Sequence, residues 1–142
     1  MLCIIMVLID QVIKYYVFMN KPKIVLIPKV LSITYAQNTG TAFGLAQGSN
    51  SILMISSIVI ILLILFFIFK KTDKYSIKRK LWELILAGGI GNLIDRICRG
   101  FVIDYVSIKF FGVCNLADFC IVVGVVLLAI LELRDIIIDK ET

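Results

Sequence analysis

The stretch SILMISSIVIILLILFFIF, Ser51–Phe69, contains 19 consecutive residues without a charge. A helix crosses the hydrocarbon core of a bilayer with about 20 apolar residues, so this stretch predicts a membrane-spanning helix. The composition of the whole chain agrees, because 61% of its 142 residues are hydrophobic and only 18% are charged. An ordinary soluble domain has about 45–50% apolar and about 25% charged residues. We therefore expect one compact integral membrane protein.

Three further apolar segments accompany this stretch in the chain. Residues 1–19 carry Asp10, Gln11 and Lys14 in their middle and lack a basic start, which argues against a cleavable signal peptide. Residues 81–98 and 116–136 are long enough to cross a membrane but contain acids. With residues 51–69, they predict a mainly α integral membrane protein with four transmembrane helices, forming a single membrane domain over residues 1–142.

The charge of the connections predicts the orientation. Residues 70–80, KKTDKYSIKRK, contain six Lys or Arg and one Asp, which is typical of a cytoplasmic loop. Both chain ends are then cytoplasmic, and residues 20–50 and 99–115 form outer loops. Within the first outer loop, Leu31–Tyr35 alternates as a strand does, so we expect a small sheet on the outer membrane surface.

Several chemistries are excluded by residue counts. The chain has no histidine, which removes His-based triads and His-ligated metals. Its cysteines are not spaced as CxxC, so we interpret them as small buried hydrophobic residues and expect no metal or other cofactor. The net charge of +5 is explained by cytoplasmic loops, and we expect no nucleic-acid partner. The four cysteines are Cys3, Cys98, Cys114 and Cys120.

Charged residues at membrane depth are costly and so are functional candidates. Asp10 and Lys14 are four residues apart and can pair on one helix face. An internal ion pair and a contact with substrate both remain open for them.

A second polar group ends the segment 81–98. Asn92 and Asp95 share one helix face, Asp95 and Arg99 can pair, and three glycines just before them would allow a neighbouring helix to approach closely. Asp95 has basic neighbours, including Arg96, so it suits an ionised structural acid. This group is either a polar cluster that fixes the helix or a direct substrate site.

Asp104 and Asp118 differ from the others, because neither has a basic residue at helical spacing. Both are expected near the outward ends of adjacent antiparallel helices. Two carboxyls that meet there would share one proton, so that one could act as a base on water while the other donates to a carbonyl oxygen. Peptide hydrolysis needs only this pair. Proton- or cation-coupled transport, lipid binding and a purely structural role remain alternatives.

Four motifs follow one another along nearly the whole chain. They are DQVIK at Asp10–Lys14, NTGTAFG at Asn38–Gly44, GGIGNLIDRICRGFVIDY at Gly88–Tyr105 and NLAD at Asn115–Asp118. In this order they resemble bacterial lipoprotein signal peptidases (signal peptidase II), which are membrane aspartyl proteases. The chain differs from the usual pattern at Thr41, at Ser107 and in a shorter segment between Asp104 and Asp118.

The resemblance implies a fold and an activity. The fold would be a four-helix domain of the bacterial cell (inner) membrane with a small extracytoplasmic β-cradle and a small outer helix. The enzyme would be an aspartic endopeptidase that cleaves diacylglyceryl-modified prolipoproteins just before the lipobox cysteine, near the outer face. Membrane lipid and globomycin-type inhibitors would be further partners.

The resemblance also implies roles for individual residues. Asp104 and Asp118 match the catalytic pair. The positions that match substrate-binding residues are Asn38, Asn92, Arg96 and Asn115. Asp10 and Lys14 match a supporting acid and its basic partner, and Asp95 joins them as structural support.

Overall fold

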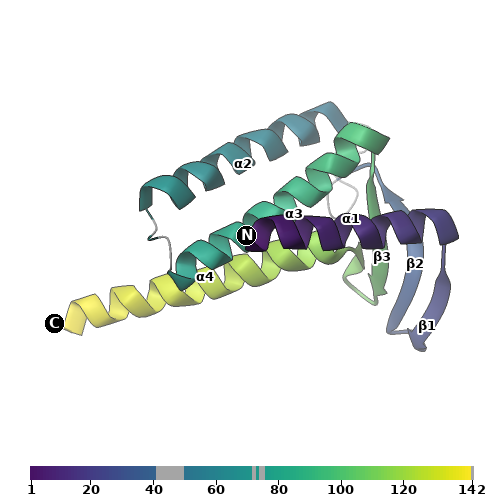
Figure 1. Ribbon diagram of the computed structural model, residues 1–142. Helices are drawn as coiled ribbons and strands as arrows, with labels where there is room; N and C mark the ends of the chain where they lie inside the picture. Colours follow the sequence, from purple (N-terminus) through teal and green to yellow (C-terminus); the bar gives the residue numbers. More distant parts are fainter. Residues whose placement is uncertain (41–49, 72, 74–75, 142) are drawn as a thin grey trace.

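The computed structural model describes residues 1–40, 50–71, 73 and 76–141 of the chain. Four helices run along one another, and a small sheet lies at one end of the bundle (Figure 1). The helices are α1 (Leu2–Asn20), α2 (Asn50–Lys71), α3 (Ile77–Arg99) and α4 (Leu116–Glu141). The strands are β1 (Lys23–Ile27), β2 (Leu31–Asn38), β3 (Val102–Ile108) and β4 (Gly112–Cys114).

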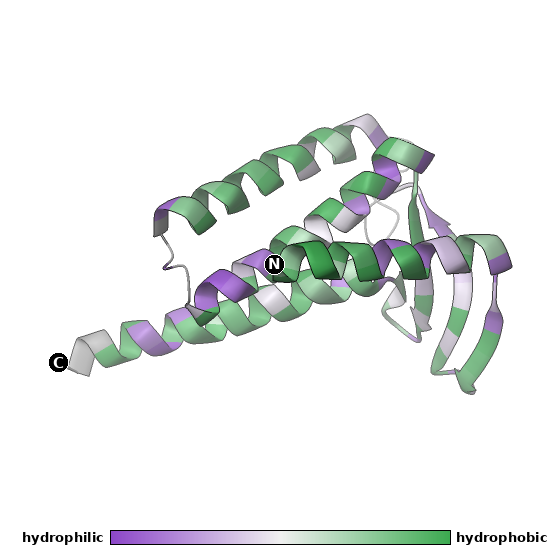
Figure 2. Ribbon diagram, in the orientation of Figure 1, coloured by the Kyte–Doolittle hydropathy of each residue, from purple (hydrophilic) through white to green (hydrophobic). Residues whose placement is uncertain are grey.

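Three of the helices, α1, α2 and α4, are long and apolar enough to cross a membrane. Large apolar side chains stay exposed along them, among them Leu8, Leu62 and Ile130, which is the pattern of lipid-facing helices. The ribbons of these helices are coloured as hydrophobic over most of their length (Figure 2). The prediction of a mainly helical membrane-type chain is therefore confirmed for three helices.

The central helix α3 is different. It packs against each of the other three helices, and it carries two of the buried polar residues, Asn92 and Asp95. It begins at Ile77, earlier than the apolar segment starting at residue 81, because the Ser76 side chain accepts a hydrogen bond from the Arg79 N–H and caps the helix. Gly100 ends it in the left-handed conformation, at φ 80°.

The sheet is antiparallel with the strand order β1-β2-β3-β4. The strand expected over Leu31–Tyr35 is present and continues to Asn38. The second connection was expected to be a loop, yet it contributes β3 and β4, and Ala36 pairs with Asp104. This difference arises because β3 finds its partner far away along the chain, which local patterns do not reveal. Among the described residues there is no helix beyond the four, and residues 41–44 of the NTGTAFG motif lie outside them.

The apolar core is divided into two clusters. One joins α2, α3 and α4 in the bundle and includes Ile64, Ile85 and Leu128. The other, with Val17, Ile103 and Tyr105, joins α1 to β3 at the end of the bundle. This second cluster holds the strand that carries Asp104 against the helices.

Candidate active site

The N-terminus of α4 carries the first half of the site. Asn115 precedes the helix, and its side-chain Oδ1 accepts a hydrogen bond from the Asp118 N–H at 3.0 Å. The Asp118 carboxylate in turn accepts from the Asn115 N–H at 3.1 Å. This reciprocal arrangement is a capping box, which fixes the Asp118 side chain at the positive end of the helix dipole.

Two other elements satisfy the next backbone N–H groups of α4. The Leu116 N–H donates to the Tyr105 hydroxyl of β3 at 3.1 Å. The Ala117 N–H donates to the Asp10 carboxylate of α1 at 3.1 Å. The start of α4 is therefore held by α1 and β3 as well as by its own cap, and Asp118 cannot shift without breaking these bonds.

Asp104 carries the second half of the site, from the middle of β3. It is 2% exposed and accepts hydrogen bonds from Asn115 Nδ2 at 2.6 Å and Asn38 Nδ2 at 2.9 Å. Burial raises the pKa of Asp104 to about 6, against the lowering effect of the Asn38 hydrogen bond and with a further rise from the Asp118 charge. A carboxyl with this pKa can hold a proton close to neutral pH.

Two asparagines connect the carboxyl groups. Asn92 Nδ2 donates to Asp118 at 2.7 Å, and Asn115 Nδ2 donates both to Asp104 and to Asn92 Oδ1, the latter at 3.1 Å. The structure thus brings the two predicted aspartates into one hydrogen-bonded group, although α4 and β3 carry them separately. The positions of Asn38, Asn92 and Asn115 that were predicted from sequence all belong to this group.

A buried lysine lies behind the asparagines. The side chain of Lys14 has no exposed surface, and its Nζ is 2.9 Å from Asp10, 3.1 Å from Asp95 and 2.9 Å from Asn92 Oδ1. The expected pair of Asp10 and Lys14 is confirmed. The contact with Asp95 on α3 was not foreseen, because no sequence spacing connects α1 to α3.

Asp95 extends this cluster to the sheet. It accepts a hydrogen bond from the Ile103 N–H at 3.1 Å and forms the expected ion pair with Arg99. Ile103 directly precedes Asp104, so the Asp95 side chain helps to set the position of the catalytic candidate.

Arg96 is less closely tied to the group. Its Nη1 donates to the Asn92 carbonyl at 3.5 Å, and it forms no ion pair with any residue that the structure describes. The charges of Asp118 and Asp104 nonetheless act on it. Its guanidinium therefore remains open to another acceptor.

Sequence reasoning missed two supporting side chains and the role of one glycine. Gln11 Nε2 donates to the Gly91 carbonyl at 3.1 Å and so connects α1 to α3. A Cβ at Gly91 would lie 2.7 Å from Asp10 Oδ2, so the carboxyl group occupies the space that a side chain would take. The Tyr105 hydroxyl accepts the hydrogen bond from the Leu116 N–H at the start of α4. The sequence signal for these residues was their place in the motifs: Gln11 lies in DQVIK, Gly91 in GGIGN and Tyr105 in VIDY.

The remaining candidate ligands form no metal site. Among the described residues, no group of three or more Cys, Asp or Glu side chains is placed to hold an ion. All four cysteines have free thiols, and only Cys120 is buried. The expectation that all are buried is wrong for Cys98, which is exposed near the end of α3. The described site holds a pair of carboxyl groups, of which Asp104 is buried and Asp118 is half-buried.

Comparisons with known proteins agree with one another. The model of the family described as signal peptidase (SPase) II matches residues 2–134. A lipoprotein signal peptidase of Caldicellulosiruptor bescii is 41% identical over 118 residues, covering 83% of this chain and 77% of that protein. One from Halothermothrix orenii is 36% identical and covers 88% of each chain. A solved bacterial membrane enzyme superimposes with a TM-score of 0.86 at 30% identity, covering 94% of this chain and 86% of the other.

Proposed function

The chain belongs to the signal peptidase II family, and from this premise we propose that Asp104 and Asp118 are its catalytic pair. As a member, it is a membrane peptidase that removes signal peptides from prolipoproteins. The single observation that supports the pair is the hydrogen-bonded group in which Asn92 and Asn115 connect the two carboxyls. This family relationship also favours peptidase activity over transport by the same acids.

The different surroundings of the two carboxyls assign their roles. Asp118 is half-buried and accepts hydrogen bonds from Asn92 and from the Asn115 N–H, so water can reach it more readily than it can reach the buried Asp104. It takes a proton from water as the water oxygen bonds to the scissile carbonyl carbon. Asp104 holds the shared proton and gives it to the carbonyl oxygen.

The second half of the reaction returns both groups to their starting state. The tetrahedral intermediate breaks its C–N bond as Asp118 passes the proton to the leaving amine. Asp104 recovers its proton when the carbonyl re-forms. No metal, cofactor or covalent enzyme intermediate is needed.

The surrounding polar residues divide into positioning and support. Asn92 and Asn115 orient the two carboxyls through hydrogen bonds, and Asn38 holds Asp104 from β2. Arg96 is free to bind a carbonyl of the substrate, so that these four residues form the substrate-binding group. Lys14, Asp10 and Asp95 form the supporting cluster, which contacts the site through the bond from Lys14 to Asn92.

We propose the peptide bond just before a diacylglyceryl-modified lipobox cysteine as the bond that is cleaved. The acyl chains of that cysteine remain in the membrane while the peptide needs water. The N-terminus of α4 and the sheet meet at one end of the bundle, where both requirements are fulfilled (Figure 1). A globomycin-type cyclic peptide would bind the same pair and block it.

We propose that α3 is the fourth membrane crossing. Its 23 residues span about 35 Å at the rise of an α-helix, which suffices for a bilayer. Its sequence is less apolar than that of the other helices because it lies between them and faces little lipid. Its polar residues are satisfied internally, as membrane burial requires.

The same proposal fixes the orientation of the single membrane domain. The C-terminal end of α2 and the N-terminal end of α3, which carry basic residues, lie at the end of the bundle opposite to the sheet (Figure 1). With that end in the cytoplasm, both termini are cytoplasmic, and the sheet and carboxyl pair lie at the outer face of the bacterial cell membrane.

The decisive experiment is a cleavage assay with the full chain in detergent micelles. A prolipoprotein with a diacylglyceryl cysteine serves as substrate, and parent, Asp104→Asn and Asp118→Asn are compared. We expect each variant to lose at least about 100-fold in kcat, because each removes one proton-transfer group. Asp135→Asn, far along α4, is the matched control and should retain activity. Near-normal cleavage by either site variant, with thermal unfolding like the parent, would refute the assignment.

A further inference from the structure

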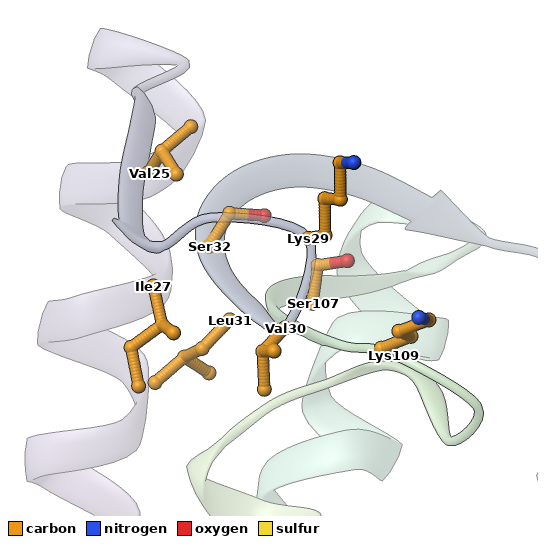
Figure 3. Close-up of a pocket in the computed structure, with 8 residues that line it drawn as sticks. All are labelled: Val25, Ile27, Lys29, Val30, Leu31, Ser32, Ser107 and Lys109. Carbon is orange, nitrogen blue, oxygen red and sulfur yellow. The ribbon is translucent and has the colours of Figure 1, made fainter.

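A pocket lies at the far end of the sheet, away from the carboxyl pair. We call the turns 28–30 and 109–111, with the strand ends that they join, the sheet tip. Its pocket has a volume of about 290 Å³, the size of a small headgroup rather than of a whole lipid (Figure 3). The lining residues are Val25, Ile27, Lys29, Val30, Leu31, Ser32, Ser107 and Lys109.

The sheet register places the two turns side by side. Leu31 pairs with Ile108 and Ser32 pairs with Ser107 across β2 and β3. The Lys109 N–H donates to the Val30 carbonyl at 2.9 Å, which ties one turn to the other. The pocket is therefore formed by two segments far apart in sequence and held together by backbone hydrogen bonds.

The polar part of the pocket is suited to an anion. Lys29 and Lys109 are both exposed and bring their ammonium groups to its rim (Figure 3). Ser32 and Ser107 add two hydroxyl donors. Neither residues 20–37 nor residues 105–114 contain an acid, so nothing on these two hairpins neutralises the lysines. Phosphate is an anion that lysine commonly binds.

The sheet tip also carries exposed apolar side chains. Phe110 and Phe111 are 88% and 81% exposed, and the apolar side chains on β1 and its turn are also exposed, namely Val25, Leu26, Ile27 and Val30. Exposed aromatic and aliphatic side chains beside lysines are typical of surfaces that enter the headgroup layer of a membrane.

The backbone at both turns has a conformation that favours glycine, yet both positions carry large side chains. Lys29 at φ 61° and Phe110 at φ 72° are non-glycine residues in the left-handed region. Glycine would fit both places with less strain, and such strain is typical of functional positions. The two strained positions carry one cation and one apolar ring, the two kinds of group that a phospholipid surface binds.

We propose that the sheet tip binds the phosphate headgroup of an acidic phospholipid of the outer leaflet. The two lysines and two serines take the phosphate, and the phenylalanines enter the acyl region beside it. The same strand β3 runs from the tip to Asp104, so this contact holds the catalytic strand at a defined depth. The proposal rests on the outward orientation given above but not on the catalytic roles of the aspartates.

The test measures lipid binding to the full chain in micelles of a zwitterionic detergent, by native mass spectrometry. Phosphatidylglycerol and phosphatidylcholine of equal chain length are titrated separately. We expect the parent to bind phosphatidylglycerol more tightly than phosphatidylcholine. The variant Lys29→Gln/Lys109→Gln should lose about 25-fold in affinity for phosphatidylglycerol, because each lysine near a lipid surface contributes about fivefold. Lys21→Gln/Lys23→Gln removes the same charge from the same hairpin outside the pocket and should bind within about twofold of the parent.

Further measurements distinguish lipid binding at the sheet tip from binding of free phosphate or of the substrate peptide. Asp118→Asn should bind phosphatidylglycerol as the parent does, so loss of cleavage alone leaves the inference untouched. Equal affinity for the two lipids, or an unchanged affinity in the Lys29/Lys109 variant, would overturn it. Displacement of the lipid by millimolar inorganic phosphate would also overturn it and indicate a free-phosphate site. If Lys29→Gln/Lys109→Gln raised the KM for prolipoprotein in lipid-free micelles but bound phosphatidylglycerol as the parent does, the surface would be assigned to the substrate peptide instead.

Discussion

Asp104 and Asp118 have the same chemistry but different surroundings, and the difference lies in what donates to them. Asp104 is buried on β3, and among the described residues its hydrogen-bond donors are the side-chain amides of Asn38 and Asn115. Asp118 is half-buried and accepts a backbone N–H at the start of α4. Water can therefore reach Asp118 more readily, while Asp104 is suited to keep the proton.

The hydrogen bond from Asn38 lowers the pKa of Asp104, which leads to a prediction about the pH dependence of activity. The Asn38 amide donates to Asp104 and favours the ionised form, so Asn38→Ala should raise the pKa of Asp104 above about 6. In the proposed mechanism, activity requires the protonated form of Asp104, which is present below this pKa and is lost as pH rises through it. The alkaline limb of the pH profile of kcat/KM should therefore move upward in Asn38→Ala, while kcat falls. Gln37→Ala, at an exposed neighbour, should leave the limb in place. A limb that moves to lower pH would contradict the assignment of the proton to Asp104.

Lys14 is the residue whose loss should be most damaging to stability. Its ammonium is buried between Asp10 and Asp95, so Lys14→Met leaves two buried carboxylates without their shared cation. Removing one partner of a buried ion pair costs about 3–5 kcal/mol of unfolding free energy. Thermal unfolding in detergent should show a large drop for Lys14→Met and little change for Tyr15→Met, whose side chain is exposed. Equal unfolding temperatures would mean that the buried carboxyls are neutral instead.

At the scale of elements, the contact between α3 and α4 fixes Asn92 relative to Asp118. Gly88 permits this contact, because a Cβ there would lie 2.3 Å from the Ala117 carbonyl oxygen and 2.6 Å from Ile121. A Cβ at Gly89 would lie 3.4 Å from Ile61 of α2, which is ordinary contact. Adjacent glycines in one helix are thus subject to different constraints.

Alanine at these two positions forms a matched pair of variants. Gly88→Ala should separate the helices, lowering the unfolding free energy by about 1–3 kcal/mol and also reducing kcat as Asp118 shifts. Gly89→Ala should be neutral or stabilising by up to about 1 kcal/mol, because alanine favours a helix. Chemical or thermal unfolding with a parallel cleavage assay measures both effects. If Gly88→Ala were as stable and active as Gly89→Ala, close packing would not be what positions the site.

At the scale of the whole molecule, the two ends of the bundle have different chemistry. The end with the α2–α3 connection has surface ion pairs such as Lys78 with Asp135, at 2.8 Å. The opposite end has the sheet, the buried polar group and the sheet tip (Figure 1). This division is expected of a membrane enzyme that works at one face only.

Reporter fusions test that division directly. Alkaline phosphatase, which is active only outside the cytoplasm, should be active when fused after Gln37 or Ile108 and inactive after Asp73. The physical reason is that, in the proposed orientation, the Lys- and Arg-rich residues 70–80 stay in the cytoplasm. A fusion with green fluorescent protein at the same positions should give the reverse pattern. Activity after Asp73 would place the carboxyl pair on the wrong side for prolipoprotein cleavage.

The sequence by itself determined the membrane class, the approximate helices and the residues of the candidate site. These are local properties, since the apolar stretch Ser51–Phe69 and the i,i+4 pair of Asp10 and Lys14 depend only on nearby residues. The motif order added Asp104 and Asp118 through resemblance to a family.

Only the tertiary structure decided how these residues meet. The contact of Lys14 with Asp95, the donation from Ala117 to Asp10 and the strand that carries Asp104 all join segments far apart in the chain. Local periodicity cannot specify such partners, because they depend on which helix and strand surfaces pack together. The pocket at the sheet tip has the same origin, since its two lysines are brought together only by the register of β2 on β3.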